Sequence, residues 1–137
     1  TYDCIMENIN RIERRDDRIS VMEKLFSYDM NNEFILLNPV DDYSEFVTEL
    51  VNFVCVNKDK VDEVIKNSLV NYKLNRLSYV DRAIIRMATA EMMMGTAVAV
   101  VINEALEIVK IYSDQGDGNA VRFINKVLDN VSKNIER

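Results

Sequence analysis

Apolar side chains recur every three or four residues in six segments of the chain, a spacing that puts them on one face of an α-helix. The segments span about 5–30, 43–54, 61–72, 77–94, 98–112 and 120–131, and the first could be one helix or two. In Leu77–Met94 apolar residues cover most of the helical circumference, and Arg82, Arg86 and Thr89 form a narrow polar stripe. A helix this apolar must be covered on several sides. We therefore expect it to be the central helix of an all-α fold.

Polar residues at segment boundaries suggest where helices begin. Ser78 followed by Asp81 is a capping-box pattern for the central helix, and Asp42 with Glu45 resembles a cap pair for the second segment. Glu91 falls on the apolar side of the central helix, where an unpaired buried carboxylate would be costly. We expect Glu91 to have a donor or cation as partner, and favour a structural anchor over a functional group.

Composition excludes several classes of function. The chain has 137 residues, enough for one domain, and contains one proline, three glycines and no histidine. Histidine-based catalysis and most zinc sites are therefore excluded, and no other spacing suggests a catalytic residue, a metal site or a cofactor. Cys4 and Cys55 have no metal or redox spacing, which favours reduced thiols in a cytoplasm. No apolar run approaches the roughly 18 residues needed to cross a bilayer, and no signal peptide is expected.

One face of the first predicted helix is rich in arginine, although the net charge of the chain is −6. Arg11, Arg14, Arg15 and Arg18 are spaced so that a helix places all four on the same side. They could be a solvated helix end with internal ion pairs, each worth a few tenths of a kcal/mol. They could also form a phosphate-binding ridge. The acidic net charge implies that any nucleic-acid surface must be a local patch of this kind.

Three motifs in the second half of the chain resemble the NusB family of bacterial transcription antitermination factors. They are LSYVDRAIIRMATAE at 77–91, VINEALEIVKIYSD at 101–114 and RFINKVLDNV at 122–131, and RRDDRISVMEKLFSYD at 14–29 resembles the family more weakly. The resemblance implies an all-α fold of two packed three-helix bundles without enzymatic activity. It also implies binding to boxA RNA of ribosomal operons together with NusE, a small-subunit ribosomal protein, in a complex with other Nus factors and RNA polymerase.

The resemblance also implies functions for particular residues. Asp81 matches a position that faces NusE, and it also belongs to the predicted capping box. Phe26 stands where the family usually has a tyrosine, and either base stacking or core packing suits Phe26 and Phe123. The positions that match RNA-contacting residues of the family are Arg14, Arg15, Arg18, Phe26, Arg122 and Phe123.

Departures from the family pattern leave a second interpretation open. Asp16 and Asp17 interrupt an arginine cluster that is usually more basic, which should weaken RNA binding by this chain alone. The alternative is a helical module that serves protein–protein contacts without RNA. We expect residues 1–13 to be an N-terminal extension and 14–137 to be one domain with halves at about 14–74 and 75–137. The location is expected to be a bacterial cytoplasm, and the sequence leaves open whether the chain is a monomer or a homodimer.

Overall fold

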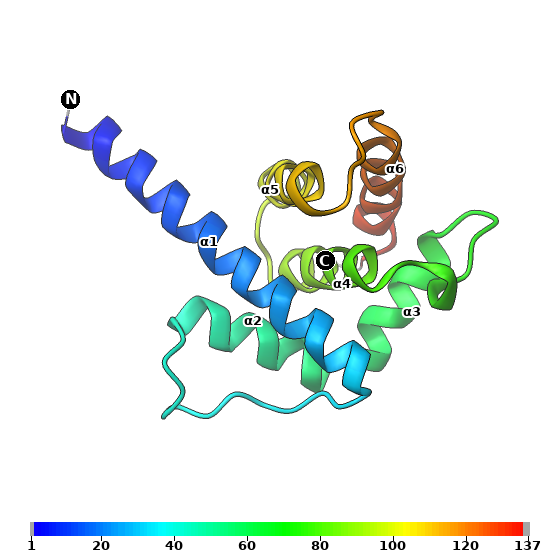
Figure 1. Ribbon diagram of the computed structural model, residues 1–137, viewed down its shortest axis with the longest axis horizontal. Helices are drawn as coiled ribbons and strands as arrows, with labels where there is room; N and C mark the ends of the chain where they lie inside the picture. Colours follow the sequence, from blue (N-terminus) through cyan, green and yellow to red (C-terminus); the bar gives the residue numbers. More distant parts are fainter. Residues whose placement is uncertain (1, 136–137) are drawn as a thin grey trace.

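The computed structural model of the protein describes residues 2–135, apart from the side chains of residue 2 and residues 7–13. Within this part the chain is all helical, as predicted, with six α-helices, one short 3-10 helix and no strand. The helices are α1 (Tyr2–Asn31), α2 (Glu45–Val56), α3 (Lys58–Ser68), η1 (Leu74–Arg76), α4 (Tyr79–Met93), α5 (Val98–Tyr112) and α6 (Asn119–Asn134). Helix α1 is a single continuous helix, and its N-terminal turns extend beyond the other helices (Figure 1).

Helix α4 is the centre of the fold, as its apolar circumference predicts. It contacts all five other α-helices, and Figure 1 shows it between α1 and α2 on one side and α5 and α6 on the other. Every residue from Arg82 to Met92 is buried. The polar stripe of Arg82, Arg86 and Thr89 is therefore covered by protein as well, which the hydrophobic pattern did not indicate.

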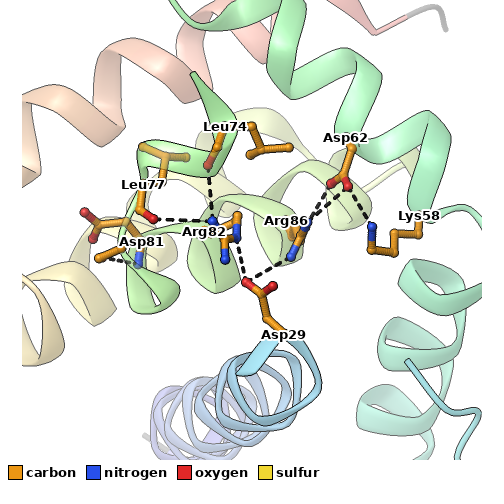
Figure 2. A network of polar contacts seen from close by, with 9 residues as sticks. Asp29, Lys58, Asp62, Leu74, Leu77, Asp81, Arg82 and Arg86 are labelled. Atoms are coloured by element: carbon orange, nitrogen blue, oxygen red, sulfur yellow. Dashed lines mark hydrogen bonds and ion pairs between the residues drawn. The ribbon is translucent and has the colours of Figure 1, made fainter. Parts of the chain in front are cut away.

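Buried ion pairs explain how charged residues of α4 are accommodated in the interior. Arg82 Nε lies 2.6 Å from Asp29 Oδ2 at the C-terminal turn of α1. Arg86 Nε lies 2.8 Å from Asp62 Oδ1 of α3, and Figure 2 shows both arginines with their carboxylate partners. A buried charge is tolerated when it is paired and hydrogen-bonded. These pairs join the central helix to α1 and to α3.

Helix starts agree with the sequence at α4 and differ at α2. Ser78 Oγ accepts a hydrogen bond from the backbone N–H of Asp81, 3.1 Å away, as a capping box predicts. The Asp81 carboxylate instead accepts a hydrogen bond from the Ser113 hydroxyl. At α2 the cap is Ser44, whose Oγ accepts from the Val47 N–H, so the cap predicted at Asp42 is wrong. Ser44 directly precedes the first helical residue, and its hydroxyl is within reach of the third N–H.

One continuous core packs the helices together. Its largest fully buried side chains come from all six α-helices and include Leu25, Leu50, Ile65, Ile84, Ile108, Ile124 and Leu128. In α6 the buried residues are Ile124, Val127, Leu128 and Val131. Ala120 and Phe123, which the spacing predicts on the same buried face, are only partly buried. Cys4 and Cys55 are both free thiols.

Candidate nucleic-acid interface

The arginines predicted to form one ridge on α1 have different environments. Arg14 is exposed, and its guanidinium carbon lies 4.2 Å from the centroid of the Phe46 ring on α2. Contact with an aromatic face holds a guanidinium without using its N–H donors. Arg14 therefore keeps hydrogen-bonding capacity for a ligand in solvent.

Arg15 is partly engaged by a carboxylate of α5. Its Nε and Nη2 donate to Glu104 Oε2 at 3.0 and 2.7 Å, and 36% of the side chain is exposed. An arginine carries five N–H donors in a fixed planar fork. Two of them hold Arg15 against α5, and Nη1 remains to face a ligand.

Arg18 is buried and does not belong to the exposed surface. Its Nε and Nη2 donate to Glu91 Oε1 and Oε2 at 2.8 and 2.6 Å, and the two side chains are only 6% and 3% exposed. Arg18 Nη1 also lies 3.8 Å from Glu104 Oε1. This bidentate pair confirms that Glu91 is a structural anchor with a cationic partner. The spacing of the ridge correctly placed Arg18 on the same side of α1, but that side is covered at Arg18 because α4 and α5 pack there.

The fourth arginine of the ridge, Arg11, has a side chain outside the described residues. Close to the described arginines, Asp16 is exposed and Asp17 is half-buried. Asp16 and Asp17 directly follow Arg14 and Arg15 in the sequence, so their two negative charges lower the positive potential around this part of α1. The basic patch is therefore smaller than the sequence spacing suggests.

Glu104 and Phe46 are residues of this surface that the sequence analysis missed. Glu104 is 8% exposed and lies between Val101 and Ala105 on the buried face of α5. A carboxylate within an apolar helical face was the available signal, as it was for Glu91. No comparable signal marks Phe46, since its spacing on α2 is that of an ordinary core residue.

The other predicted site residues lie around the opposite end of α4. Phe26 is half-buried, and its ring centroid lies 6.2 Å from that of Tyr79 in an edge-to-face contact. Arg122 is exposed, and its Nη2 donates to the Asn119 side chain and, at 3.3 Å, to the carbonyl of Asp117. Phe26 and Asp81 are thus near the N-terminal end of α4, whereas Arg18 pairs with Glu91 close to its C-terminal end.

Phe123 combines a packed and a partly exposed position at the start of α6. Its ring centroid lies 5.5 Å from that of Tyr72, and the residue packs against the core without being fully buried. Both structural packing and contact with a ligand are compatible with this position. The structure therefore divides the predicted residues into an arginine surface on α1 and a separate group on α1, α4 and α6.

The glycine-rich turn before α6 is occupied by its own carboxylate. Asp114 Oδ2 accepts hydrogen bonds from the N–H groups of Gly116 and Gly118 at 3.0 and 3.3 Å. Desolvation alone would raise the pKa of Asp114, but these backbone hydrogen bonds outweigh it and lower the pKa. The turn is thus closed to an external anion. In the part of the chain that the structure describes, no three potential metal ligands gather into one group.

The fold and this surface define a small all-α domain built around one buried helix, with a basic region on its first helix. The family model described as "NusB family" matches residues 4–133 of this chain. The chain therefore belongs to this family of transcription antitermination factors. Transcription antitermination protein NusB of Bacillus licheniformis is 38% identical over 133 residues, covering 91% of this chain and 100% of the relative. NusB of Bacillus subtilis is 35% identical over 135 residues, covering 92% of this chain and 99% of the relative.

Solved structures show the same fold. NusB of T. maritima superposes with a TM-score of 0.74 at 29% identity, covering 88% of this chain and 90% of that one. A protein chain in the crystal structure of a plectonemic RNA supercoil has a TM-score of 0.72 at 24% identity and shows the fold alone. The family consists of antitermination factors and is not a known enzyme family. Among residues 2–135, no helix combines the length and apolarity that a membrane span requires.

Proposed function

We propose that this protein binds boxA RNA of ribosomal RNA operons together with NusE and thereby suppresses premature transcription termination. In this proposal it acts in a bacterial cytoplasm, in a complex with other Nus factors and RNA polymerase. The observation that carries the proposal is the exposed Arg14 beside the half-exposed Arg15 on α1, in a chain that belongs to the NusB family.

The geometry of the arginine surface suits a phosphate backbone. Arg14 is held by the Phe46 ring, and Arg15 is held by the Glu104 carboxylate, so both guanidinium groups are restrained before a ligand arrives. Restraint lowers the entropy cost of forming charge-assisted hydrogen bonds to phosphate oxygens. Arginine phosphate contacts position RNA, and its sequence would be read by contacts to the bases elsewhere on the complex.

A helical protein–protein module without RNA binding is the second candidate, and one observation favours it. Arg18 is buried against Glu91, which removes one of the three arginines of α1 that match the RNA contacts of the family. Two arginines beside Asp16 and Asp17 provide few phosphate contacts. We therefore propose that binding depends on NusE, which would contribute further contacts to the RNA.

Asp81 is the residue proposed to face NusE. Its carboxylate is half-buried and accepts a hydrogen bond from Ser113. The first turn of α4 and the residue that ends α5 together fix its position. A carboxylate held in this way can pair with a cationic residue of a partner without much loss of side-chain entropy.

The test is fluorescence anisotropy of a labelled boxA RNA and a scrambled RNA, each titrated with the protein in the presence and absence of NusE. We expect selective binding of boxA that NusE strengthens, and we expect Arg14→Gln to weaken it. Lys60→Gln is the matched control because Lys60 is an exposed cation on α3, away from the arginine surface. Equal affinity for both RNAs with and without NusE would leave the protein–protein module as the better description.

A further inference from the structure

A basic cavity lies at the C-terminal end of α1, whereas the arginine surface lies near the middle of that helix. It is open to solvent, has a volume of about 610 Å³ and is lined by the C-terminal end of α1, the following loop, α3, η1 and α4. Its walls include Phe34, Lys58, Lys66, Tyr72 and Lys73. Small-molecule sites in proteins occupy about 300–1,000 Å³, so the cavity has a suitable size for one ligand.

Positive charge is in excess around this cavity, in contrast to the chain as a whole. Three lysines and two arginines line it, and Asp29 is the only carboxylate among the described residues that form its wall. Asp62, from α3, adds a second carboxylate next to the cavity by pairing with Arg86 and, at 3.1 Å, with Lys58. Five cations are thus balanced by two carboxylates. Such a surface attracts a small anion.

The two arginines that line the cavity, Arg82 and Arg86, share a small number of acceptors. Arg82 donates from Nε to Asp29 and from Nη1 to the carbonyls of Leu74 and Leu77, as Figure 2 shows. Arg86 Nη1 is buried and, among the described residues, has no hydrogen-bond acceptor, although it lies 3.2 Å from Asp29 Oδ2. Arg82 and Arg86 thus share Asp29, and Asp62 is shared by Arg86 and Lys58, so two carboxylates face three cations in this part of the cavity wall.

The lysines at the entrance are available to a ligand. Lys66 and Lys73 are exposed, and within residues 2–135 neither has an ion-pair partner. Lys66 lies in the last turn of α3, where a cation also stabilises the helix terminus. Lys73 has no such explanation, because it precedes η1 in an extended conformation.

Aromatic rings complete the recognition chemistry. Tyr72 is 49% exposed and is supported by Phe123, so a flat group could stack on it at the cavity entrance. Phe34 forms another part of the wall, with the cations of Lys58 and Arg86 at 5.2 and 5.4 Å from its ring centroid. We propose that this cavity binds a free mononucleotide, with its phosphate between Lys66 and Lys73 and its base against Tyr72.

Isothermal titration calorimetry of the full chain with adenosine monophosphate tests the site. Adenosine and inorganic phosphate are titrated separately as controls. Adenosine can only stack its base on Tyr72, and inorganic phosphate can only bind the lysines. We expect adenosine monophosphate to bind at least about tenfold more tightly than either compound, because it uses both the lysines and the ring. We also expect affinity to fall as salt is raised, since the lysines are exposed. Equal affinities of all three compounds, or no heat up to about 5 mM nucleotide, would overturn the proposal.

Lys66→Gln with Lys73→Gln is the decisive variant, and Lys60→Gln with Lys126→Gln is its matched control. Both double variants remove two exposed positive charges, but Lys60 and Lys126 do not line the cavity. We expect the cavity variant to weaken nucleotide binding by about tenfold or more and the control to change it less than about twofold. Thermal unfolding of each variant establishes that it is folded. Equal losses in both variants would show that the lysines act through net charge alone and would refute the site.

A competition experiment separates a free nucleotide from a nucleotide of RNA. Unlabelled boxA RNA is added to the complex with adenosine monophosphate, and the calorimetric titration is repeated. If the cavity is a mononucleotide site, RNA leaves the affinity unchanged. If RNA displaces the nucleotide, and the cavity variant also weakens RNA binding, the cavity belongs to the RNA path and the mononucleotide proposal is wrong.

Discussion

Replacing Arg18 by alanine should destabilise the protein far more than replacing Arg14, although both residues belong to the same arginine series on α1. Arg18→Ala leaves Glu91, only 3% exposed, as a buried carboxylate without its bidentate partner. Removing one member of a buried ion pair costs about 3–5 kcal/mol, because the remaining charge is desolvated and unpaired. Arg14→Ala removes one exposed contact with the Phe46 ring, worth about 0.5–1 kcal/mol.

These free energies convert into distinct melting temperatures. An unfolding entropy of about 2.1 cal/mol/K per residue gives about 0.3 kcal/mol/K for a chain of 137 residues. Arg18→Ala should therefore lower Tm by about 10–17 °C, and Arg14→Ala by about 2–3 °C. Circular dichroism at a helical wavelength during heating measures both values.

The double variant Arg18→Met with Glu91→Leu distinguishes charge pairing from packing. A buried ion pair can often be replaced by apolar side chains of similar volume with little loss of stability. We expect the double variant to recover most of the stability that Arg18→Ala loses. RNA anisotropy on the same samples should show weaker binding for Arg14→Ala. The structural assignment of Arg18 would be wrong if Arg18→Ala kept a Tm within about 3 °C of the parent and lost RNA affinity instead.

Three further predictions concern stability. Leu128→Ala should cost about 2–5 kcal/mol in denaturant unfolding, because Leu128 is fully buried, and a loss near zero would contradict the packing of α6. Ser44→Ala should lower the free energy of unfolding by about 1 kcal/mol, and Asp42→Ala by less than about 0.5 kcal/mol, because Ser44 is the N-cap of α2. A larger loss for Asp42→Ala than for Ser44→Ala would show that Asp42 is the cap instead. Burial alone would raise the pKa of Asp62, but hydrogen bonding and charge from Arg86 lower it below the usual value. Its contribution to stability is thus present above pH about 4 and lost as pH falls through the lowered pKa, so Asp62→Asn should be less stable at neutral pH and lose less stability on acidification. Urea titrations from pH 7 to pH 3 measure this difference, and parallel pH curves would refute it.

The sequence was sufficient for the helices because their signals are local. The periodicity of α4 and α6 predicted their approximate extent, and Ser78 marked the start of α4, but the pattern did not predict that the polar stripe of α4 is buried as well. The cap of α2 was misassigned because Asp42 and Ser44 are both good capping residues and lie two positions apart. Choosing between them requires knowing where the chain turns after Pro39.

The candidate site was less predictable because burial of an arginine depends on residues distant in sequence. Helical spacing placed Arg14, Arg15 and Arg18 on one side of α1. It could not show that Glu91 and Glu104, more than 70 residues away, would cover that side at Arg18. Glu91 was identified as needing a partner, but several cations were equally compatible with its position. Only the packing of α1 against α4 selects Arg18.

The buried charges that hold α1 in place also limit the RNA contacts that this helix could make in the proposed function. Arg18 pairs with Glu91, and Asp29 pairs with Arg82, so α1 is attached to the central helix at two points about 16 Å apart along its axis. Arg14 and Arg15 lie about one turn from the first attachment, which restrains their guanidinium groups. A phosphate bound by Arg18 as well would have to displace Glu91 from the Arg18 guanidinium. The Glu91 carboxylate would then be left in the interior without its partner. In the proposed function, RNA would therefore gain a small, rigid set of contacts from this chain, and we expect selective binding only when NusE supplies the rest.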